Sequence, residues 1–298
     1  MNWTILGAGA IGALFATQLH RLEENVRFLD LRQTVNTRRQ FHLTTLTHES
    51  YAADLEITSN VGGIDCLLVT TKVWQIEAAL TPLIPLLSES TPIVLIHNGM
   101  GTTEWVKTHF PHNPLIACVI SAGAYKPDRY SVIHSGFGEC WCGALNDAGA
   151  QFQTRIAKIN QALGHAKWAE QIEEKQWRKL VVNAVINPLT ATLNVKNGEL
   201  IHQAAKIKNL CDELTRLLTK LGFRETSEEW MQLVMTVISR TAENYSSMQQ
   251  DISHQRKSEI EFITGHILRQ AAEYDLAMPT HHQLYKEVVA LESRYSAD

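Results

Sequence analysis

Short apolar runs alternate with amphipathic stretches over the first 145 residues of the chain. The apolar runs have the length and the β-branched content of buried strands, and they occupy residues 3–6, 26–30, 66–70, 93–97 and 115–121. This alternation predicts a parallel sheet whose strands are joined by crossover helices. Residues 134–143 predict one or two further strands at the edge of that sheet, although three glycines weaken the pattern.

The pattern changes near residue 168. Helical spacing covers residues 173–194, 202–221, 228–244 and 259–274, and the alternation typical of strands disappears. The sequence therefore predicts an α/β N-terminal domain, residues 1–169, followed by an all-α C-terminal domain, residues 170–298. A cleft between two such domains is the expected place for a ligand.

Composition agrees with two globular domains and narrows the possible partners. The 298 residues are 45% hydrophobic and 19% charged, with a formal net charge of −4 and no basic stripe, so nucleic acid is not an expected partner. No apolar run reaches the roughly 18 residues of a membrane span, and the start of the chain lacks a basic leader. We expect a cytoplasmic protein that does not bind a membrane.

The five cysteines are dispersed along the chain without the spacing of a zinc site. We interpret them as buried free thiols and expect no metal site. They occupy positions Cys66, Cys118, Cys140, Cys142 and Cys211.

A glycine-rich turn follows the first apolar run and leads into a helical pattern. It consists of Gly7, Ala8, Gly9, Ala10, Ile11 and Gly12. In a dinucleotide fingerprint the first glycine allows the tight turn, the second lets the backbone approach the pyrophosphate, and the third lets helix and strand pack closely. We interpret the turn as a site for a nicotinamide dinucleotide; the alternative is a glycine turn with a purely structural role.

The end of the second predicted strand leaves the form of the cofactor open. Asp30 suits the free ribose hydroxyl of NAD, whereas Arg32 suits the 2′-phosphate of NADP.

A polar stripe on an otherwise apolar helical segment is the most informative feature of the second half. Lys179, Asn183 and Asn187 are spaced by four residues, which places them on one face of a helix. Burying these groups without partners is costly, so the stripe faces either a ligand or a polar network within the protein. Pro188 is expected to kink or end the helix at Asn187.

Four further sites along the chain carry polar groups that are weak signals when taken alone. Ser246 and Ser247 could equally cap a helix, and Glu259 would by default be a solvated residue. Lys72 and the segment 97–101, which contains Asn98, follow predicted strands at the end where doubly wound sheets bind ligands.

Together these segments resemble the ketopantoate reductase (2-dehydropantoate 2-reductase) family over nearly the whole chain. The shared motifs are LGAGAIG at 6–12, TKVWQ at 71–75, LIHNGMG at 95–101, WRKLVVNAVINPLT at 177–190, NGEL at 197–200 and ENYSSMQQDI at 243–252. The resemblance implies a Rossmann-type α/β domain followed by a helical domain, in agreement with the change of pattern near residue 168.

The resemblance also implies roles for individual residues. Lys179 corresponds to the catalytic lysine, and Glu259, the second catalytic candidate, lies near the cofactor and the substrate hydroxyl. The implied substrate-binding residues are Asn98, Asn183, Asn187, Asn197, Asn244 and Ser247. The implied cofactor-binding residues are Gly7, Ala8, Gly9, Ala10, Ile11, Gly12, Arg32, Lys72, Asn98, Ala124 and Glu259.

The implied activity is the reduction of ketopantoate to pantoate in pantothenate and coenzyme A synthesis, with NADPH as reductant and NADP+ as product. The chain departs from the family at its second strand, because the basic residue often falls one position before Arg32, where this chain has Leu31. Asp30 would repel a 2′-phosphate unless it turned away.

Two alternatives to that activity are a reductase of another small 2-keto acid and a non-catalytic NADP(H) sensor. A small-molecule substrate and a monomer or homodimer are expected.

Overall fold

The computed structural model describes residues 1–163 and 166–295, and the chain divides into two compact units. The first unit comprises Met1–His97 and Thr102–Lys175; the second comprises Asn98–Gly101 and Gln176–Asp298. The functional boundary expected between residues 169 and 170 stays a prediction.

Five parallel strands form the centre of the sheet in the first unit, and they are the five predicted from the apolar runs. They are β1 (Asn2–Leu6), β2 (Asn25–Leu29), β5 (Cys66–Val69), β6 (Ile93–Leu95) and β7 (Leu115–Ile120). β1 lies between β2 and β5, so the order of the strands reverses at β1. The carboxyl end of such a strand is where doubly wound sheets bind ligands.

Six more strands extend the sheet on both sides among the described residues. They are β3 (Thr37–Thr44), β4 (Ser50–Thr58), β8 (Gly123–Tyr125), β9 (Ser131–Gly136), β10 (Cys140–Ala144) and β11 (Ala166–Trp168). The complete order is β11-β10-β7-β6-β5-β1-β2-β4-β3-β9-β8. The expectation of strands added within 134–143 at the edge of the predicted sheet is confirmed for β10, which pairs with β7, whereas β9 pairs with β3 and β8 and lies away from the five central strands.

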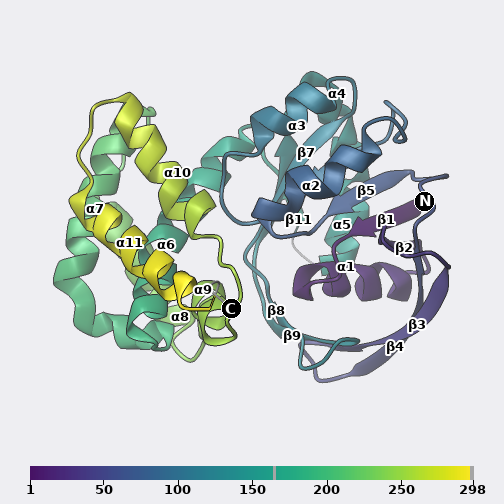
Figure 1. The fold of residues 1–298 in the computed structure, drawn as a ribbon, viewed down its shortest axis with the longest axis horizontal. Helices are drawn as coiled ribbons and strands as arrows, with labels where there is room; N and C mark the ends of the chain where they lie inside the picture. The colour runs from purple at the N-terminus through teal and green to yellow at the C-terminus, as the bar shows by residue number, and fades with distance from the viewer. Residues whose placement is uncertain (164–165, 296–298) are drawn as a thin grey trace. The chain divides into compact units, whose positions relative to one another are not determined.

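Helices cover both faces of the central strands. α1 (Ala10–Arg21) and α5 (Ile156–Leu163) pack together on one face, and β3, β4, β8 and β9 curve around α1 (Figure 1). The remaining helices and 3-10 turns of this unit are η1 (Val73–Gln75), α2 (Ile76–Leu80), η2 (Thr81–Leu83), α3 (Thr103–His109), α4 (Asp147–Ala150) and η3 (Gln151–Arg155). Leu14 and Phe15 of α1 are buried against the sheet, in one cluster with Ile5 and Leu68.

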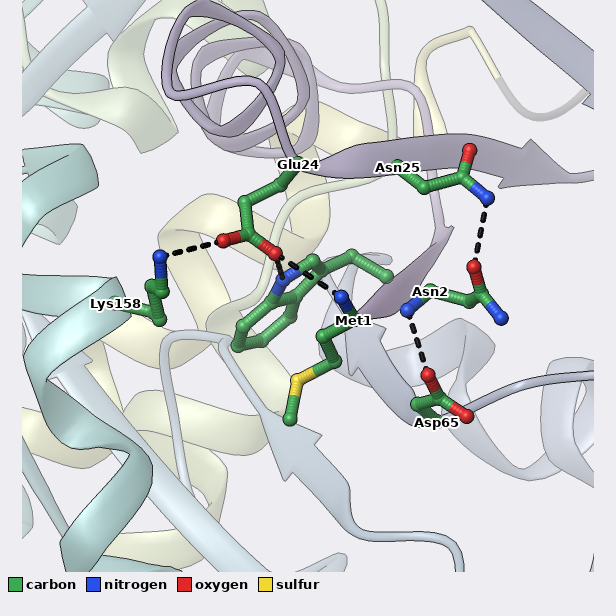
Figure 2. Close-up of polar contacts among 7 residues, drawn as sticks. Met1, Asn2, Glu24, Asn25, Asp65 and Lys158 are labelled. Atoms are coloured by element: carbon green, nitrogen blue, oxygen red, sulfur yellow. Dashed lines mark hydrogen bonds and ion pairs between the residues drawn. The ribbon is translucent and has the colours of Figure 1, made fainter.

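A polar cluster fixes the beginning of β1 (Figure 2). The Glu24 carboxylate accepts hydrogen bonds from Trp3 Nε1 at 3.2 Å and from the Met1 amino group at 3.4 Å, and lies 2.7 Å from Lys158 Nζ. The hydrogen bond with Lys158 lowers the pKa of Glu24 more than burial raises it. The carboxylate therefore joins the start of β1 to a residue of α5.

The second unit is helical throughout its described part, as predicted. It comprises most of α6 (Ile172–Leu193), then η4 (Asn197–Gln203), α7 (Ala204–Lys220), α8 (Ser227–Arg240), α9 (Ser247–Ser253), α10 (Ile260–Glu273) and α11 (Pro279–Ser293). Its core is separate from that of the sheet and includes Val181 and Val185 of α6 and Leu214 of α7. No described helix is long and apolar enough to cross a membrane.

α6 continues through Pro188 to Leu193, so the alternative that the helix ends at Asn187 is wrong. Proline removes one backbone hydrogen bond, but packing on a buried helix can offset this loss. The residues from Ala184 to Ala191 on this helix are all buried, which supplies that packing.

Candidate active site

The turn between β1 and α1 has the geometry of a phosphate-binding loop. Gly7 has a φ of +114°, and a Cβ there would lie 2.8 Å from the Thr71 backbone nitrogen. A Cβ at Gly12 would collide with the Gly7 carbonyl oxygen, so close packing of helix and strand requires both glycines. A Cβ at Gly9 would meet nothing within 4 Å, and Ala8 and Gly9 are exposed. The open side of the loop is therefore available to a ligand.

The first turn of α1 offers positive potential at this loop. Gly9 caps the helix without a side-chain hydrogen bond, and the first turn contains no acidic residue. Its N–H groups are suited to an anion. Ala10 and Ile11, the first residues of the helix, are half-buried.

Asp30 and Arg32 form a pair after β2. Arg32 Nε and Nη2 donate to the two carboxylate oxygens of Asp30 at 2.9 and 3.2 Å. Hydrogen bonding from Arg32 lowers the pKa of Asp30 and raises that of Arg32. The guanidinium is almost fully exposed, so a ligand phosphate could reach it, but Asp30 already occupies two of its donors.

The other two cofactor candidates of the first unit lie in different elements. Lys72 precedes η1, and its backbone N–H donates to Gln75 Oε1 at 3.2 Å. Ala124 is half-buried in β8, opposite His134. Neither position has sequence periodicity that would have identified it without the family motif.

The polar stripe of α6 is present as predicted. Lys179 is half-buried, Asn183 is half-buried and Asn187 is 6% exposed. Among the described residues, the side-chain amides of Asn183 and Asn187 have no hydrogen-bond partner. Their polar atoms are not among the fully buried ones, so both amides remain accessible to a ligand. The absence of a partner favours the ligand interpretation over a closed polar network.

Asn197 and Asn244 are brought together near the end of α8. The Asn197 backbone N–H donates to the Asn244 carbonyl at 2.9 Å, and Asn197 Nδ2 donates to Thr241 Oγ1 at 2.8 Å. Asn197 Oδ1 is buried and has no hydrogen-bond partner within the described chain. Asn244 itself is exposed. The unsatisfied Asn197 oxygen is an acceptor that a ligand hydroxyl could satisfy.

Ser246 and Ser247 have different environments. Ser246 caps α9, since its Oγ accepts from the Gln249 N–H at 3.1 Å, and it also lies 2.7 Å from Thr190 Oγ1 on α6. Ser247 is the exposed first residue of α9. Of the two serines, Ser246 has the structural role and Ser247 keeps a hydroxyl accessible to solvent.

Asn98 and Glu259 meet although 161 positions separate them. Asn98 Nδ2 donates to Glu259 Oε2 at 3.2 Å, and the Met100 N–H donates to the Phe262 carbonyl at 2.9 Å. Gly99 permits this approach, because its φ is +80° and a Cβ there would lie 2.7 Å from the Phe262 oxygen. Glu259 is 4% exposed, so the default interpretation of a solvated residue is wrong.

Lys126, which the sequence patterns did not single out, also lies at the glycine loop. Its Nζ donates to the Ala8 carbonyl at 2.9 Å. A single lysine after a three-residue strand has no periodic signal, so only the tertiary structure identifies it.

All five cysteines are free and buried, which confirms the interpretation as buried thiols. Cys118 Sγ lies 3.3 Å from Cys140 Sγ and 3.1 Å from Cys142 Sγ. Hydrogen bonding with these two neighbours, together with burial, raises the pKa of Cys118. The three thiols belong to the apolar core of the first unit.

Two family descriptions match consecutive parts of the chain. "Ketopantoate reductase PanE/ApbA" matches residues 3–147, and the corresponding C-terminal description matches residues 171–292. The chain belongs to the ketopantoate reductase family. It is therefore an oxidoreductase, and this family uses NADPH.

Relatives within the ketopantoate reductase family align over almost their full length. The 2-dehydropantoate 2-reductase of Vibrio cholerae is 35% identical over 99% of both chains. The enzyme of Escherichia coli O157:H7 is 35% identical over 99% of this chain and 96% of the relative, and that of Bacillus subtilis is 30% identical over 98% of both.

Solved structures share the fold of this ketopantoate reductase family member. A probable 2-dehydropantoate 2-reductase from Bacillus subtilis superposes with a TM-score of 0.80 at 28% identity, over 98% of this chain and 100% of the other. A D-mandelate dehydrogenase in complex with NADH and anilino(oxo)acetate gives a TM-score of 0.90 at 23% identity, over 99% of both chains. At that identity the second comparison supports the fold alone.

Proposed function

We propose that this protein reduces ketopantoate to pantoate with NADPH, a step of pantothenate and coenzyme A synthesis. The observation that carries the proposal is the stripe of α6: Asn183 and Asn187 present amides without protein partners on the same helix face as Lys179. Relatives over 30% identical along the full chain bear the name of this activity, which supports the same substrate.

The residues of the stripe suit the charge changes of ketone reduction. The bound reduced nicotinamide would supply the hydride to the ketone carbon. Negative charge then develops on the carbonyl oxygen, and Lys179 donates a hydrogen bond and then a proton to it. Lysine ordinarily keeps its proton at neutral pH, which suits it to act as the acid.

The amides and Ser247 orient the rest of the substrate. Ketopantoate carries a carboxylate and a primary hydroxyl besides its ketone. Asn183 and Asn187 can donate from Nδ2 and accept at Oδ1, and Asn197 Oδ1 is a buried acceptor without a partner in the described structure. Ser247 and Asn244 are exposed donors suited to the carboxylate.

The Asn98 amide and the Glu259 carboxylate form the remaining pair of candidates. Because Glu259 accepts from Asn98 Nδ2, it fixes the orientation of that amide and leaves Asn98 Oδ1 directed elsewhere. We assign Asn98 to substrate and cofactor contact, and Glu259 to holding it and contacting the substrate hydroxyl.

The direct test is NADPH oxidation in the presence of ketopantoate, compared with other small 2-keto acids. We expect ketopantoate to have the highest kcat/KM. A clear preference for another keto acid would contradict the assigned substrate, and binding of NADPH without turnover of any keto acid would contradict the enzymatic role. A monomer or homodimer is expected; sedimentation would distinguish them.

Substitution of Lys179 tests the mechanism. We expect Lys179→Ala to lower kcat by about 10² to 10⁴ because the developing alkoxide loses its proton donor. The matched control is Lys175→Ala, four residues earlier on α6, which should leave kcat unchanged. A Lys179→Ala enzyme with kcat within about threefold of wild type would refute the assigned role.

A further inference from the structure

Lys126 places an ammonium group at the glycine loop. The residue follows β8 directly, and its Nζ donates to the Ala8 carbonyl oxygen at 2.9 Å across 118 positions of sequence. Both residues belong to the first unit. The ammonium thus lies beside the loop whose backbone is open on the side of Gly9.

The charge of this ammonium is not neutralised by an ion pair. Within the described residues, no carboxylate oxygen lies within 4.0 Å of Lys126 Nζ, and the Ala8 carbonyl is its hydrogen-bond partner. The Phe41 ring centroid lies 5.9 Å from Nζ. Burial lowers the pKa of Lys126, while Asp128 opposes this shift and Arg129 adds to it. The ammonium therefore keeps its charge available to an anionic ligand at the loop.

The helix that begins at the loop also favours the binding of an anion there. The N-terminus of α1 has neither a side-chain cap nor an acidic residue in its first turn, and it begins immediately after Ala8 and Gly9. The lysine and the helix N-terminus therefore contribute positive potential to one loop from two different elements. A pyrophosphate carries two negative charges and matches this combination.

We propose that Lys126 is a cation of the pyrophosphate subsite, held in place by the Ala8 carbonyl and contributing to the affinity for any dinucleotide. The proposal rests on the cofactor assignment made under the proposed function. It differs from the role of Arg32, because a contact with the pyrophosphate does not distinguish NADPH from NADH.

The test compares three variants by titrating NADPH, NADH, ADP and AMP with intrinsic fluorescence. Lys126→Met removes charge and donor, Lys126→Gln keeps an N–H donor for Ala8 but removes the charge, and Lys126→Arg keeps both. Lys107→Met is the matched control, since Lys107 is a lysine of the same unit paired with Glu104 on α3.

We expect Lys126→Met and Lys126→Gln to lower the affinity for NADPH and for NADH by the same factor. That factor should be about 10-fold or more, the usual effect of losing a charged hydrogen bond. Lys126→Arg should stay within a few-fold of wild type, ADP should lose more affinity than AMP, and Lys107→Met should change nothing. The affinity of the wild type should also depend more steeply on salt than that of Lys126→Gln.

Each contrary outcome has a distinct meaning. If Lys126→Gln binds both dinucleotides as well as wild type, the ammonium only holds the loop and the proposal is wrong. If Lys126→Met lowers Tm and cannot be titrated, Lys126→Gln and Lys126→Arg still decide between charge and loop support. If the wild type binds neither dinucleotide, the proposed function itself fails.

Discussion

Asp30 holds the Arg32 guanidinium through two hydrogen bonds. These are the two residues that we propose to set the preference between NADPH and NADH. A 2′-phosphate must compete with the Asp30 carboxylate for the same donors, and it experiences repulsion from that carboxylate. The proposed contact of Arg32 with the 2′-phosphate would therefore carry a cost that an arginine without a neighbouring carboxylate would not impose.

Substitution of Asp30 should consequently change cofactor preference. We expect Asp30→Asn to tighten NADPH binding by about 3- to 10-fold and to weaken NADH binding, because Arg32 is released and the ribose hydroxyl loses its acceptor. Titration of both cofactors measures the change. Arg32→Ala is the control and should weaken NADPH selectively. Unchanged NADPH affinity in Asp30→Asn would show that the pair does not contact the nucleotide.

The sequence identifies those site residues that repeat along one helix but not those that tertiary structure brings together. Lys179, Asn183 and Asn187 are recognisable because three polar residues at a spacing of four interrupt an apolar helix. The contact between Asn98 and Glu259 is not recognisable, since it depends on tertiary structure across 161 positions. The same reason hides the contact of Lys126 with Ala8.

The N-terminus of α9 illustrates how one element divides its roles between adjacent residues. The buried Ser246 hydroxyl caps α9 and bonds Thr190 on α6, whereas Ser247 is exposed. We expect Ser246→Ala to destabilise the protein by about 2 kcal/mol through the lost cap and the lost hydrogen bond with the Thr190 hydroxyl, which keeps the Ile186 and Asn187 carbonyls as partners. Thermal unfolding would show this as a lower Tm.

Ser247→Ala is the matched control for that prediction. It should leave Tm unchanged and raise KM for the keto acid, because its hydroxyl caps no helix and is free to contact substrate. If the two variants exchanged these effects, the division of roles between the serines would be wrong.

Glu213 of α7 caps the N-terminus of α11. Its carboxylate accepts from the Thr280 N–H at 2.8 Å, from the His281 N–H at 3.1 Å and from His281 Nδ1 at 2.8 Å. Burial would raise the pKa of Glu213, but these hydrogen bonds outweigh it and lower the pKa to about 2. Burial lowers the pKa of His281 more than Glu213 raises it, so the imidazole is neutral at pH 7.

Acid should therefore destabilise this contact by protonating both the Glu213 carboxylate and the His281 imidazole. The unfolded chain protonates His281 below about pH 6.5 and Glu213 below about pH 4.5, whereas the folded protein resists both protonations. The Glu213 contribution, about 3 kcal/mol, is complete above pH 4.5 and is lost as the pH falls towards 2.

Glu213→Gln should accordingly be less stable at pH 7 and should lose less further stability between pH 4.5 and 2. Urea unfolding at a series of pH values measures both effects. The exposed Glu89→Gln is the control and should retain the pH dependence of wild type. Parallel pH profiles for Glu213→Gln and wild type would contradict this account.

The elements also show why the sequence predicts some strands better than others. The five central strands are buried on both faces, so they produce continuous apolar runs. β3 and β4 contain many exposed residues, and charged residues such as Arg38 and Arg39 interrupt their pattern, so they form no apolar run. The continuation of α6 beyond Pro188 depends on packing, which local sequence rules do not include.

At the scale of the whole molecule, the two units have separate cores that the sequence predicts through the loss of strand alternation near residue 168. The core of the sheet includes Ile5, Phe15 and Leu68, and the core of the helical unit includes Val181 and Leu214. The membership of Asn98–Gly101 in the helical unit is not predictable, because those four residues begin only three positions after the end of β6 and lie between two parts of the first unit in sequence.

The membership of Asn98–Gly101 in the helical unit has a consequence for folding during synthesis. The ribosome synthesises Asn98–Gly101 long before Phe262, whose carbonyl accepts a hydrogen bond from the Met100 N–H. Domains generally fold in the order in which they emerge, so the hydrogen bond from Met100 to Phe262 can form only after the whole of the first unit has been synthesised. A fragment that begins at residue 176 would therefore lack the backbone partner of Phe262 and the side-chain partner of Glu259, and its helical unit would be incomplete.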